Sequence, residues 1–221
     1  IWKGLVGSEM CIRDRWYDIP FAKPPVGDLR WRAPEPLDAK SQLISRRTEP
    51  AMCPQRAGSV SGVEGDAAIG AEDCLYLDVT APASGTEPLP VMVWIHGGGN
   101  TTGHKNTYDF SRFVAEQKVI VVTINYRLGP LGWFAHPALG NSPGTIANFG
   151  TLDIIAALGW VKRNIGAFGG DADNVTIFGE SAGGHNVFTL LASPLSEGLF
   201  HKAISQSVSY THLRAHETLP Y

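Results

Sequence analysis

The chain has 221 residues, of which 43% are hydrophobic and 18% are charged, and its formal net charge is −3. These values are typical of one soluble globular unit with a buried core, and they argue against a polybasic surface for nucleic acid or membranes. No apolar run reaches the length of a membrane span, so we expect no transmembrane helix. The small net charge likewise leads us to expect no nucleic-acid partner.

The two ends of the chain are interpreted as artefactual flanks. Residues 5–14 can be encoded by a DNA string whose reverse complement encodes residues 208–217, and that string looks like the adapter of transposase-based sequencing libraries. We therefore expect 1–15 and 208–221 to be translated flanks, and 16–207 to be cut from a longer gene. His212, His216 and Glu217 are then not catalytic candidates. The alternative is that both ends are genuine.

The first part of the genuine stretch gives weak structural signals. Residues 16–36 are rich in proline and arginine and predict an extended surface layer, whereas residues 57–71 predict a glycine- and serine-rich loop. Leu75, Leu77 and Val79 alternate with more polar neighbours, which predicts a half-buried strand.

Three continuous apolar runs follow, at Val91–Ile95, Val119–Ile124 and Val175–Phe178. Such runs are typical of strands in a parallel sheet that helices cover on both faces. Apolar residues at helical spacing predict one helix over 154–165 and a second helix that begins at Ser181 and passes Leu191. The alternation of strands and helices predicts an α/β fold with a mostly parallel sheet.

The first chemical motif is the segment 179–183, Gly-Glu-Ser-Ala-Gly, which matches G-x-S-x-G. The pattern alone arises often by chance, but here it stands between a predicted buried strand and a predicted helix, where a nucleophilic serine sits on a tight turn. The helix would direct its free N–H groups and positive dipole end at the reacting centre. The alternative is an ordinary glycine-rich turn with an exposed Ser181.

The second motif is the segment 96–99, His-Gly-Gly-Gly, directly after the first apolar run. Glycines let the main chain approach a substrate, and main-chain N–H groups stabilise the negative charge that ester hydrolysis develops on the carbonyl oxygen. Together with the motif around Ser181, this loop predicts an oxyanion hole made by the amides of Gly98, Gly99 and Ala182.

Six segments of the chain, in this order, resemble those of type-B carboxylesterases, the carboxylesterase/cholinesterase family of α/β-hydrolases. They are Pro24–Arg30, Glu72–Leu77, His96–Gly99, Asn125–Gly132, Phe168–Asp171 and Gly179–Gly184. The resemblance covers nearly all of residues 16–207. It implies an α/β-hydrolase fold with helices on both faces of a mostly parallel sheet, truncated before the C-terminal part of the domain.

Two positions depart from the family's pattern. Asn100 stands where the family usually has an aromatic residue after the glycine run, which implies a more polar pocket on the acyl side. Asp18 stands where the family usually has glycine.

The resemblance also implies an activity and roles for residues. The full-length parent would hydrolyse small-molecule carboxylic esters without a metal or other cofactor, and Ser181 would be the nucleophile that forms an acyl-enzyme. Glu180 resembles a family glutamate near the pocket floor, with a structural salt bridge as the alternative. Arg127 and Asp153 match a family ion pair that we treat as structural.

Cys53 and Cys74 match a family disulfide, and two free thiols are the alternative. A disulfide favours an extracytoplasmic location, secreted or periplasmic. The oligomeric state is left open by the sequence.

The catalytic acid and histidine, which the family places after the serine, are expected to lie beyond residue 207. Glu197 and His201 are four residues apart but match a family segment that supports packing, and His185 should point away from the Ser181 hydroxyl. The fragment is therefore expected to be inactive on its own. The alternative for the parent is a non-catalytic binding or adhesion module, although such relatives usually lack the serine that this chain retains.

Overall fold

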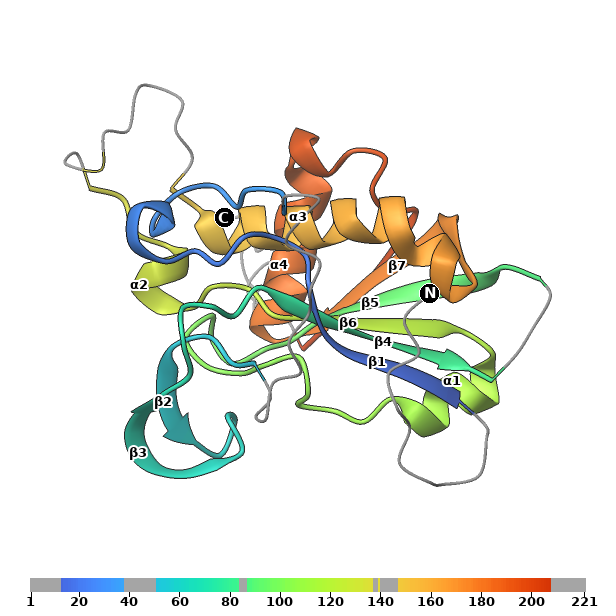
Figure 1. Ribbon diagram of the computed structural model, residues 1–221, viewed down its shortest axis with the longest axis horizontal. Helices are drawn as coiled ribbons and strands as arrows, with labels where there is room; N and C mark the ends of the chain where they lie inside the picture. Colours follow the sequence, from blue (N-terminus) through green and yellow to red (C-terminus); the bar gives the residue numbers. More distant parts are fainter. Residues whose placement is uncertain (1–12, 38–50, 84–86, 137–138, 140–146, 208–221) are drawn as a thin grey trace, which may run out of the picture.

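A computed structural model of the chain describes residues 13–37, 51–83, 87–136, 139 and 147–207. Six strands form one sheet in the spatial order β1-β4-β6-β5-β7-β8 (Figure 1). The first three pair antiparallel, and β6, β5, β7 and β8 pair parallel. The α/β fold with a mostly parallel sheet is thereby confirmed. The strands are β1 (Arg13–Pro20), β4 (Tyr76–Pro82), β5 (Leu89–Ile95), β6 (Ile120–Ile124), β7 (Gly170–Glu180) and β8 (Lys202–Gln206).

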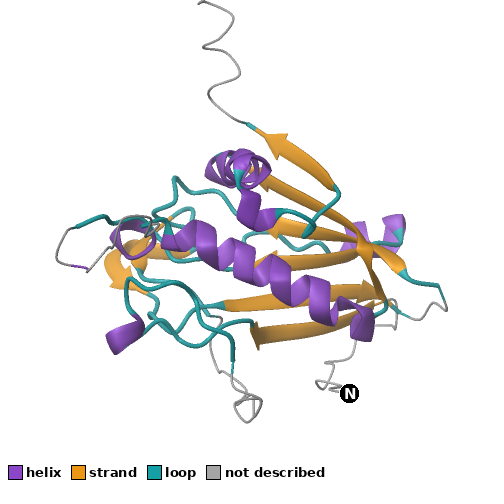
Figure 2. Cartoon of the chain, turned by 90° about the horizontal axis from the view of Figure 1, so that it is seen from above, coloured by secondary structure: helices purple, strands orange, loops and turns teal. Residues whose placement is uncertain are grey.

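Helices cover both faces of this sheet. Figure 1 shows α3 above the strands and α1 below them, and Figure 2 shows α3 lying across the sheet. The α-helices are α1 (Ser111–Gln117), α2 (Gly129–Gly132), α3 (Phe149–Asn164) and α4 (Ala182–Ala192), and short 3-10 turns occupy Gly27–Leu29, Ile165–Phe168 and Pro194–Ser196. Both helices expected from periodicity are therefore present as α3 and α4.

Side chains alternate between the two faces of the sheet along each strand, and an apolar cluster lies on each face. Val91, Val93 and Ile95 of β5 pack in one cluster with apolar residues of α3 and α4, such as Leu158. Trp94, which stands between Val93 and Ile95 in the sequence, points to the opposite face and packs in a second cluster that includes Val114 of α1. Because successive strand residues face opposite sides, a continuous apolar run is what a sheet between two helical layers requires.

Two expectations for the N-terminal half were wrong in detail. Residues 57–71 do not form one loop, because β2 (Gln55–Gly58) and β3 (Val63–Ile69) pair antiparallel as a separate two-stranded sheet. Residues 16–20, expected as part of an extended surface layer, are extended but belong to β1, the edge strand of the main sheet. Its extended backbone comes from this pairing, which the local sequence does not reveal.

Strand β1 begins at Arg13, three residues inside the expected N-terminal flank, and Arg13 lies opposite Pro82 of β4. Backbone pairing of this kind is open to almost any side chain. The artefactual origin of residues 1–15 therefore stays a prediction. The other expected flank, 208–221, with His212, His216 and Glu217, lies outside the described residues.

Cys53 and Cys74 form a disulfide, as the resemblance implied. The bond joins the segment before β2 to the segment before β4, and both cysteines are buried in the main core. None of the helices in the described ranges is long and apolar enough to cross a bilayer.

Candidate active site

The two sequence motifs meet at the carboxyl ends of neighbouring parallel strands. Ile95 of β5 lies opposite Gly179 of β7, so the segments that follow these residues leave the sheet side by side. A side-chain Cβ placed on Gly97 would lie 2.7 Å from the carbonyl oxygen of Glu180 and 3.3 Å from Cβ of Ser181. The structure thus brings the glycine loop into direct contact with the serine turn.

Ser181 has a backbone conformation that few L-residues adopt, with φ 56° and ψ −120°. It is the N-cap residue of α4, yet its side chain does not cap the helix. Serine at this position usually accepts a hydrogen bond from an amide of the first turn. The Ser181 hydroxyl therefore does not cap the helix. Backbone strain like that of Ser181 is found most often at functional sites.

Hydrogen bonds hold the strained turn on both sides. The amide of Ser181 donates to the carbonyl oxygen of Gln206 in β8 at 2.9 Å, and its carbonyl oxygen accepts from the amide of His185 at 3.0 Å. The flanking glycines leave no room for side chains. A Cβ on Gly179 would lie 2.5 Å from the carbonyl carbon of Gly183, and a Cβ on Gly183 would collide with the carbonyl oxygen of Ile95. Close packing of α4 against β5 and β7 depends on these glycines.

Three main-chain amides are predicted to form the oxyanion hole. Among the described residues, no acceptor takes a hydrogen bond from the amides of Gly98, Gly99 or Ala182. Ala182 is the first residue of α4, where amides lack a partner within the helix. Gly98 and Gly99 have φ values of 96° and 63°, and the carbonyl oxygen of Gly98 accepts from the amides of Thr101 and Thr102 at 3.1 Å. The loop is thus folded back on itself through a conformation that glycine adopts without strain.

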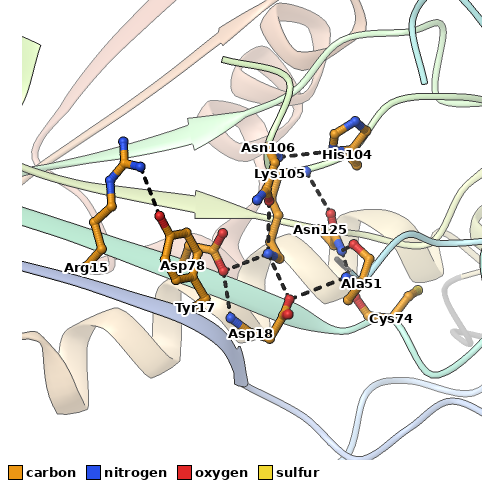
Figure 3. Close-up of polar contacts among 10 residues, drawn as sticks. All are labelled: Arg15, Tyr17, Asp18, Ala51, Cys74, Asp78, His104, Lys105, Asn106 and Asn125. Carbon is orange, nitrogen blue, oxygen red and sulfur yellow. Dashed lines mark hydrogen bonds and ion pairs between the residues drawn. The ribbon is translucent and has the colours of Figure 1, made fainter. Parts of the chain in front are cut away.

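The far end of this loop rests on buried amide side chains. Gln55 donates from Nε2 to the carbonyl oxygen of Gly103 at 2.9 Å, and its Oε1 accepts from the Gly103 amide at 2.7 Å. Asn125, after β6, accepts from the amide of Lys105 at 2.8 Å and donates to the carbonyl oxygens of Ala51 at 2.8 Å and Cys74 at 3.1 Å (Figure 3). The glycine loop is therefore anchored to the disulfide-bonded segments.

Figure 3 shows a buried ion cluster under the same loop. Nζ of Lys105 lies 2.6 Å from Oδ1 of Asp78 in β4, 2.9 Å from Oδ1 of Asp18 in β1 and 2.9 Å from Oδ1 of Asn106. The Lys105 side chain is only 1% exposed. Burial raises the pKa of Asp78, and the nearby ammonium ion of Lys105 opposes part of that rise. A lysine removed from water to this degree needs its carboxylate partners.

This cluster gives a role to Asp18, one of the two departures from the family's pattern. Asp18 has φ 50°, a conformation that favours glycine, and it lies at the register shift of β1. Its amide donates to Asp78 at 2.7 Å, and its carboxylate reaches Lys105. The charge pair with Lys105 is therefore available to offset the strain of a non-glycine residue at this position.

His96 braces the start of the glycine loop. Its ring is buried, Nδ1 lies 2.9 Å from the carbonyl oxygen of Gly97, and the ring stacks on Tyr126 with centroids 4.3 Å apart. The hydroxyl of Tyr126 donates to the carbonyl oxygen of His96 at 2.6 Å. Burial lowers the pKa of His96 to about 4, so the ring is neutral at pH 7.

The two expected pocket residues occupy different surroundings. The carboxylate of Glu180 lies against Gly97, because a Cβ on that glycine would be 3.1 Å from Oε2. Asn100 is half-buried with φ 58°, and its Oδ1 accepts from Nδ2 of Asn186 in α4 at 2.9 Å. The side chain of Asn100 is thus held by the helix that Ser181 begins.

The acid and the histidines that follow Ser181 in the sequence lie in different parts of the structure. Nδ1 of His201 accepts from the amide of Val175 at 3.1 Å, in the middle of β7. Val175 precedes Ser181 by six steps along the extended chain, which corresponds to about 20 Å. Glu197 is exposed after the 3-10 turn Pro194–Ser196, and His185 lies in the first turns of α4. The expectation that Glu197 and His201 have a packing role and no catalytic one stays a prediction.

Arg127 and Asp153 form a buried ion pair on the other side of the site. Nε and Nη2 of Arg127 donate to the two carboxylate oxygens of Asp153 at 2.8 Å and 2.6 Å, and the Arg127 amide donates to the same carboxylate at 3.0 Å. The pair ties α3 to the segment after β6. Its contacts are structural, as we expected from the resemblance.

Comparisons with known proteins agree on one family. A family model described as the carboxylesterase family matches residues 7–217. Para-nitrobenzyl esterase of Bacillus subtilis (strain 168) is 48% identical over 195 residues, covering 87% of this chain and 40% of the relative. Cocaine esterase of Homo sapiens is 48% identical over 201 residues, covering 86% of this chain and 35% of the relative.

A solved structure titled thermophylic PNB esterase superposes with a TM-score of 0.80 at 45% identity. The match covers 90% of this chain and 41% of that chain. The chain thus spans about two fifths of the length of the proteins it resembles.

Proposed function

The chain belongs to the carboxylesterase family, and on that premise we propose that its parent protein is a serine carboxylic-ester hydrolase with Ser181 as the nucleophile. The observation that carries the proposal is the setting of Ser181. Its hydroxyl makes no capping bond, its backbone is strained, and it adjoins a loop with free amides. A small-molecule ester is the substrate class that this geometry supports.

The proposed reaction proceeds through two tetrahedral intermediates. The Ser181 oxygen forms a bond to the ester carbonyl carbon, its proton passes to a general base, and the carbonyl electron pair moves onto the oxygen as an oxyanion. The amides of Gly98, Gly99 and Ala182 would stabilise that charge. Collapse breaks the bond to the alcohol, which leaves with the proton, and an acyl-enzyme remains. A water molecule then attacks in the same way and releases the carboxylic acid.

The general base and its acid partner are proposed to lie in sequence beyond this chain. In support, Nδ1 of His201 accepts from the amide of Val175 in the middle of β7, and the ring of His96 is buried against Tyr126 with Nδ1 engaged by Gly97. The matched relatives extend over more than twice the aligned length. Without a base the hydroxyl keeps its weak nucleophilicity, so the 221-residue chain alone is expected to be inactive.

Two side chains would shape the proposed pocket. Glu180 lies where its carboxylate adjoins Gly97 at the base of the site. Asn100 would line the acyl side as a polar residue where the family usually has an aromatic one. Because asparagine is smaller and more polar than an aromatic residue, the pocket would accept acyl groups that an aromatic ring excludes.

A fluorophosphonate probe tests the proposal, because it forms a covalent bond only with an activated serine. The uninterrupted gene that contains this chain is expressed, and the labelled residue is identified by mass spectrometry. We expect labelling at Ser181, loss of labelling in Ser181→Ala, and unchanged labelling in Ser205→Ala, whose hydroxyl bonds to the carbonyl oxygen of Gly184. The 221-residue chain is expected to stay almost unlabelled.

The competing function, a non-catalytic binding or adhesion module, predicts a different result. A folded parent protein that the probe leaves unmarked would support that module and contradict the esterase. Rapid labelling of the 221-residue chain would contradict only the statement that its general base lies elsewhere.

A further inference from the structure

One buried amide connects the serine helix to the glycine loop. Asn186 lies in α4, little more than one turn after Ser181, and it is 3% exposed. Its Nδ2 donates to Oδ1 of Asn100 at 2.9 Å. The hydroxyl of Tyr126, which lies 3.4 Å from the same Oδ1, donates to the carbonyl oxygen of His96 at 2.6 Å. Asn186 thereby joins α4 to the glycine loop, and Asn100 links that loop to the segment after β6.

The contact fixes Asn100 from two directions. The side chain of Asn100 is bonded to Asn186, and its carbonyl oxygen accepts from the amide of Gly129 at 2.7 Å. Asn100 directly follows Gly99, so its position determines where the last free amide of the loop points.

We infer that Asn186 is a positioning residue, which sets the distance between Ser181 and the amides of Gly98 and Gly99. The inference rests on the proposed function and deepens it. Asn100 stands where the family usually has an aromatic side chain, and a small amide cannot hold the loop by packing. The hydrogen bond from Asn186 supplies the missing restraint, which explains why this departure is compatible with an ordered loop.

The consequence of losing the restraint follows from the geometry of oxyanion stabilisation. Removal of the Asn186 amide takes the 2.9 Å hydrogen bond away from Oδ1 of Asn100 and leaves it the longer 3.4 Å contact with the hydroxyl of Tyr126. The loop then gains freedom at the residue next to Gly99. Loss of one oxyanion donor lowers kcat by roughly 100- to 1,000-fold, so partial misplacement is expected to lower kcat by about 10- to 100-fold. KM changes little, because the ground-state ester carries no oxyanion.

The test uses the full-length parent protein and a chromogenic ester. Asn186→Ala and Asn100→Ala should each lower kcat by about 10- to 100-fold, and the double variant should fall no further, because both changes remove the same bond. Affinity for a trifluoromethyl ketone, which binds serine as an oxyanion, should fall in parallel with kcat. Asn164→Ala is the matched control. Its amide bonds to the carbonyl oxygen of Trp160 at 2.8 Å in α3, away from the site, and its kcat should stay within about twofold.

Several results would overturn the inference. A drop in thermal stability of Asn186→Ala with unchanged kcat would reduce the residue to a structural role, and multiplying effects in the double variant would show that the two residues act separately. Asn100→Ala carries the same test if Asn186→Ala does not fold, since Asn100 is only half-buried. An unsubstituted parent with no turnover would refute the proposed function, and the inference with it. An active parent protein in which Asn186→Ala leaves kcat unchanged would refute the inference alone.

Discussion

The replacement of Lys105 by methionine should destabilise the protein far more than the loss of any surface charge. The ammonium group contacts the carboxylates of Asp78 at 2.6 Å and Asp18 at 2.9 Å, and the side chain is almost fully buried. Methionine has a similar length, so little cavity forms, but two carboxylates lose their counter-ion. Removal of one partner from a buried pair lowers the free energy of unfolding by about 3–5 kcal/mol.

Urea unfolding of the full-length protein, followed by tryptophan fluorescence, measures this loss. Lys162→Met is the matched control, because Lys162 pairs with Asp173 at 3.0 Å with both side chains exposed. An exposed pair of this kind contributes about 0–1 kcal/mol. Adding Asp78→Asn to Lys105→Met should recover part of the loss, since one unpaired charge disappears. Equal destabilisation by Lys105→Met and Lys162→Met would refute the assignment of a buried ion cluster.

The pH dependence of Lys105→Met provides a second signature. Burial already raises the pKa of Asp78 above that of the unfolded chain, and the loss of Lys105 should raise this pKa further. The folded state then binds a proton that the unfolded state has released. The variant should therefore be closest to wild type in acid and lose stability as the pH rises through the pKa of folded Asp78. If Lys105→Met lost the same free energy of unfolding at every pH, Lys105 would have no influence on the pKa of Asp78.

Two further variants test the glycine loop, one at His96 where the loop begins and one at Gly98 within it. Burial holds the pKa of His96 at about 4 against an ordinary value of 6.5, so its contribution to stability is complete above pH 6.5 and is lost as the pH falls toward 4. The free energy of unfolding should drop by about 3 kcal/mol over that range, and His96→Gln should remove this part of the drop in urea titrations. Gly98→Ala places a Cβ against the carbonyl oxygen of Thr102 at φ 96° and should lower kcat by about 100-fold or more. Gly166→Ala, where a Cβ meets nothing within 4 Å, should leave kcat unchanged.

The central strands could be predicted because burial on both faces of a strand requires a continuous apolar run in the sequence. The runs at 91–95, 119–124 and 175–178 became β5, β6 and β7, and helical spacing marked α3 and α4. In contrast, β8 has the exposed sequence Lys-Ala-Ile-Ser-Gln, and β3 is largely exposed. Both owe their extended form to pairing with a partner strand. Pairing across the chain leaves no periodic pattern in the sequence, which explains why these strands were missed.

The same distinction separates the parts of the candidate site. Ser181 and the glycine loop stand in short motifs whose order and context are visible in the sequence. Their supports are distant, since Asn186 bonds to a residue 86 positions away and Asn125 to one 74 positions away. Lys105 lies 27 positions from Asp78, and a lone lysine in a polar loop predicts a solvated side chain. Such contacts follow from the fold and become visible only with it.

A structure of the full-length protein after reaction with a fluorophosphonate would show whether Ser181 is the nucleophile and which amides surround the oxyanion. We expect phosphorus to be bonded to the Ser181 oxygen and the phosphoryl oxygen to lie about 2.7–3.1 Å from the amide nitrogens of Gly98, Gly99 and Ala182. An adduct on another residue, or a phosphoryl oxygen turned to solvent away from these three amides, would contradict this expectation.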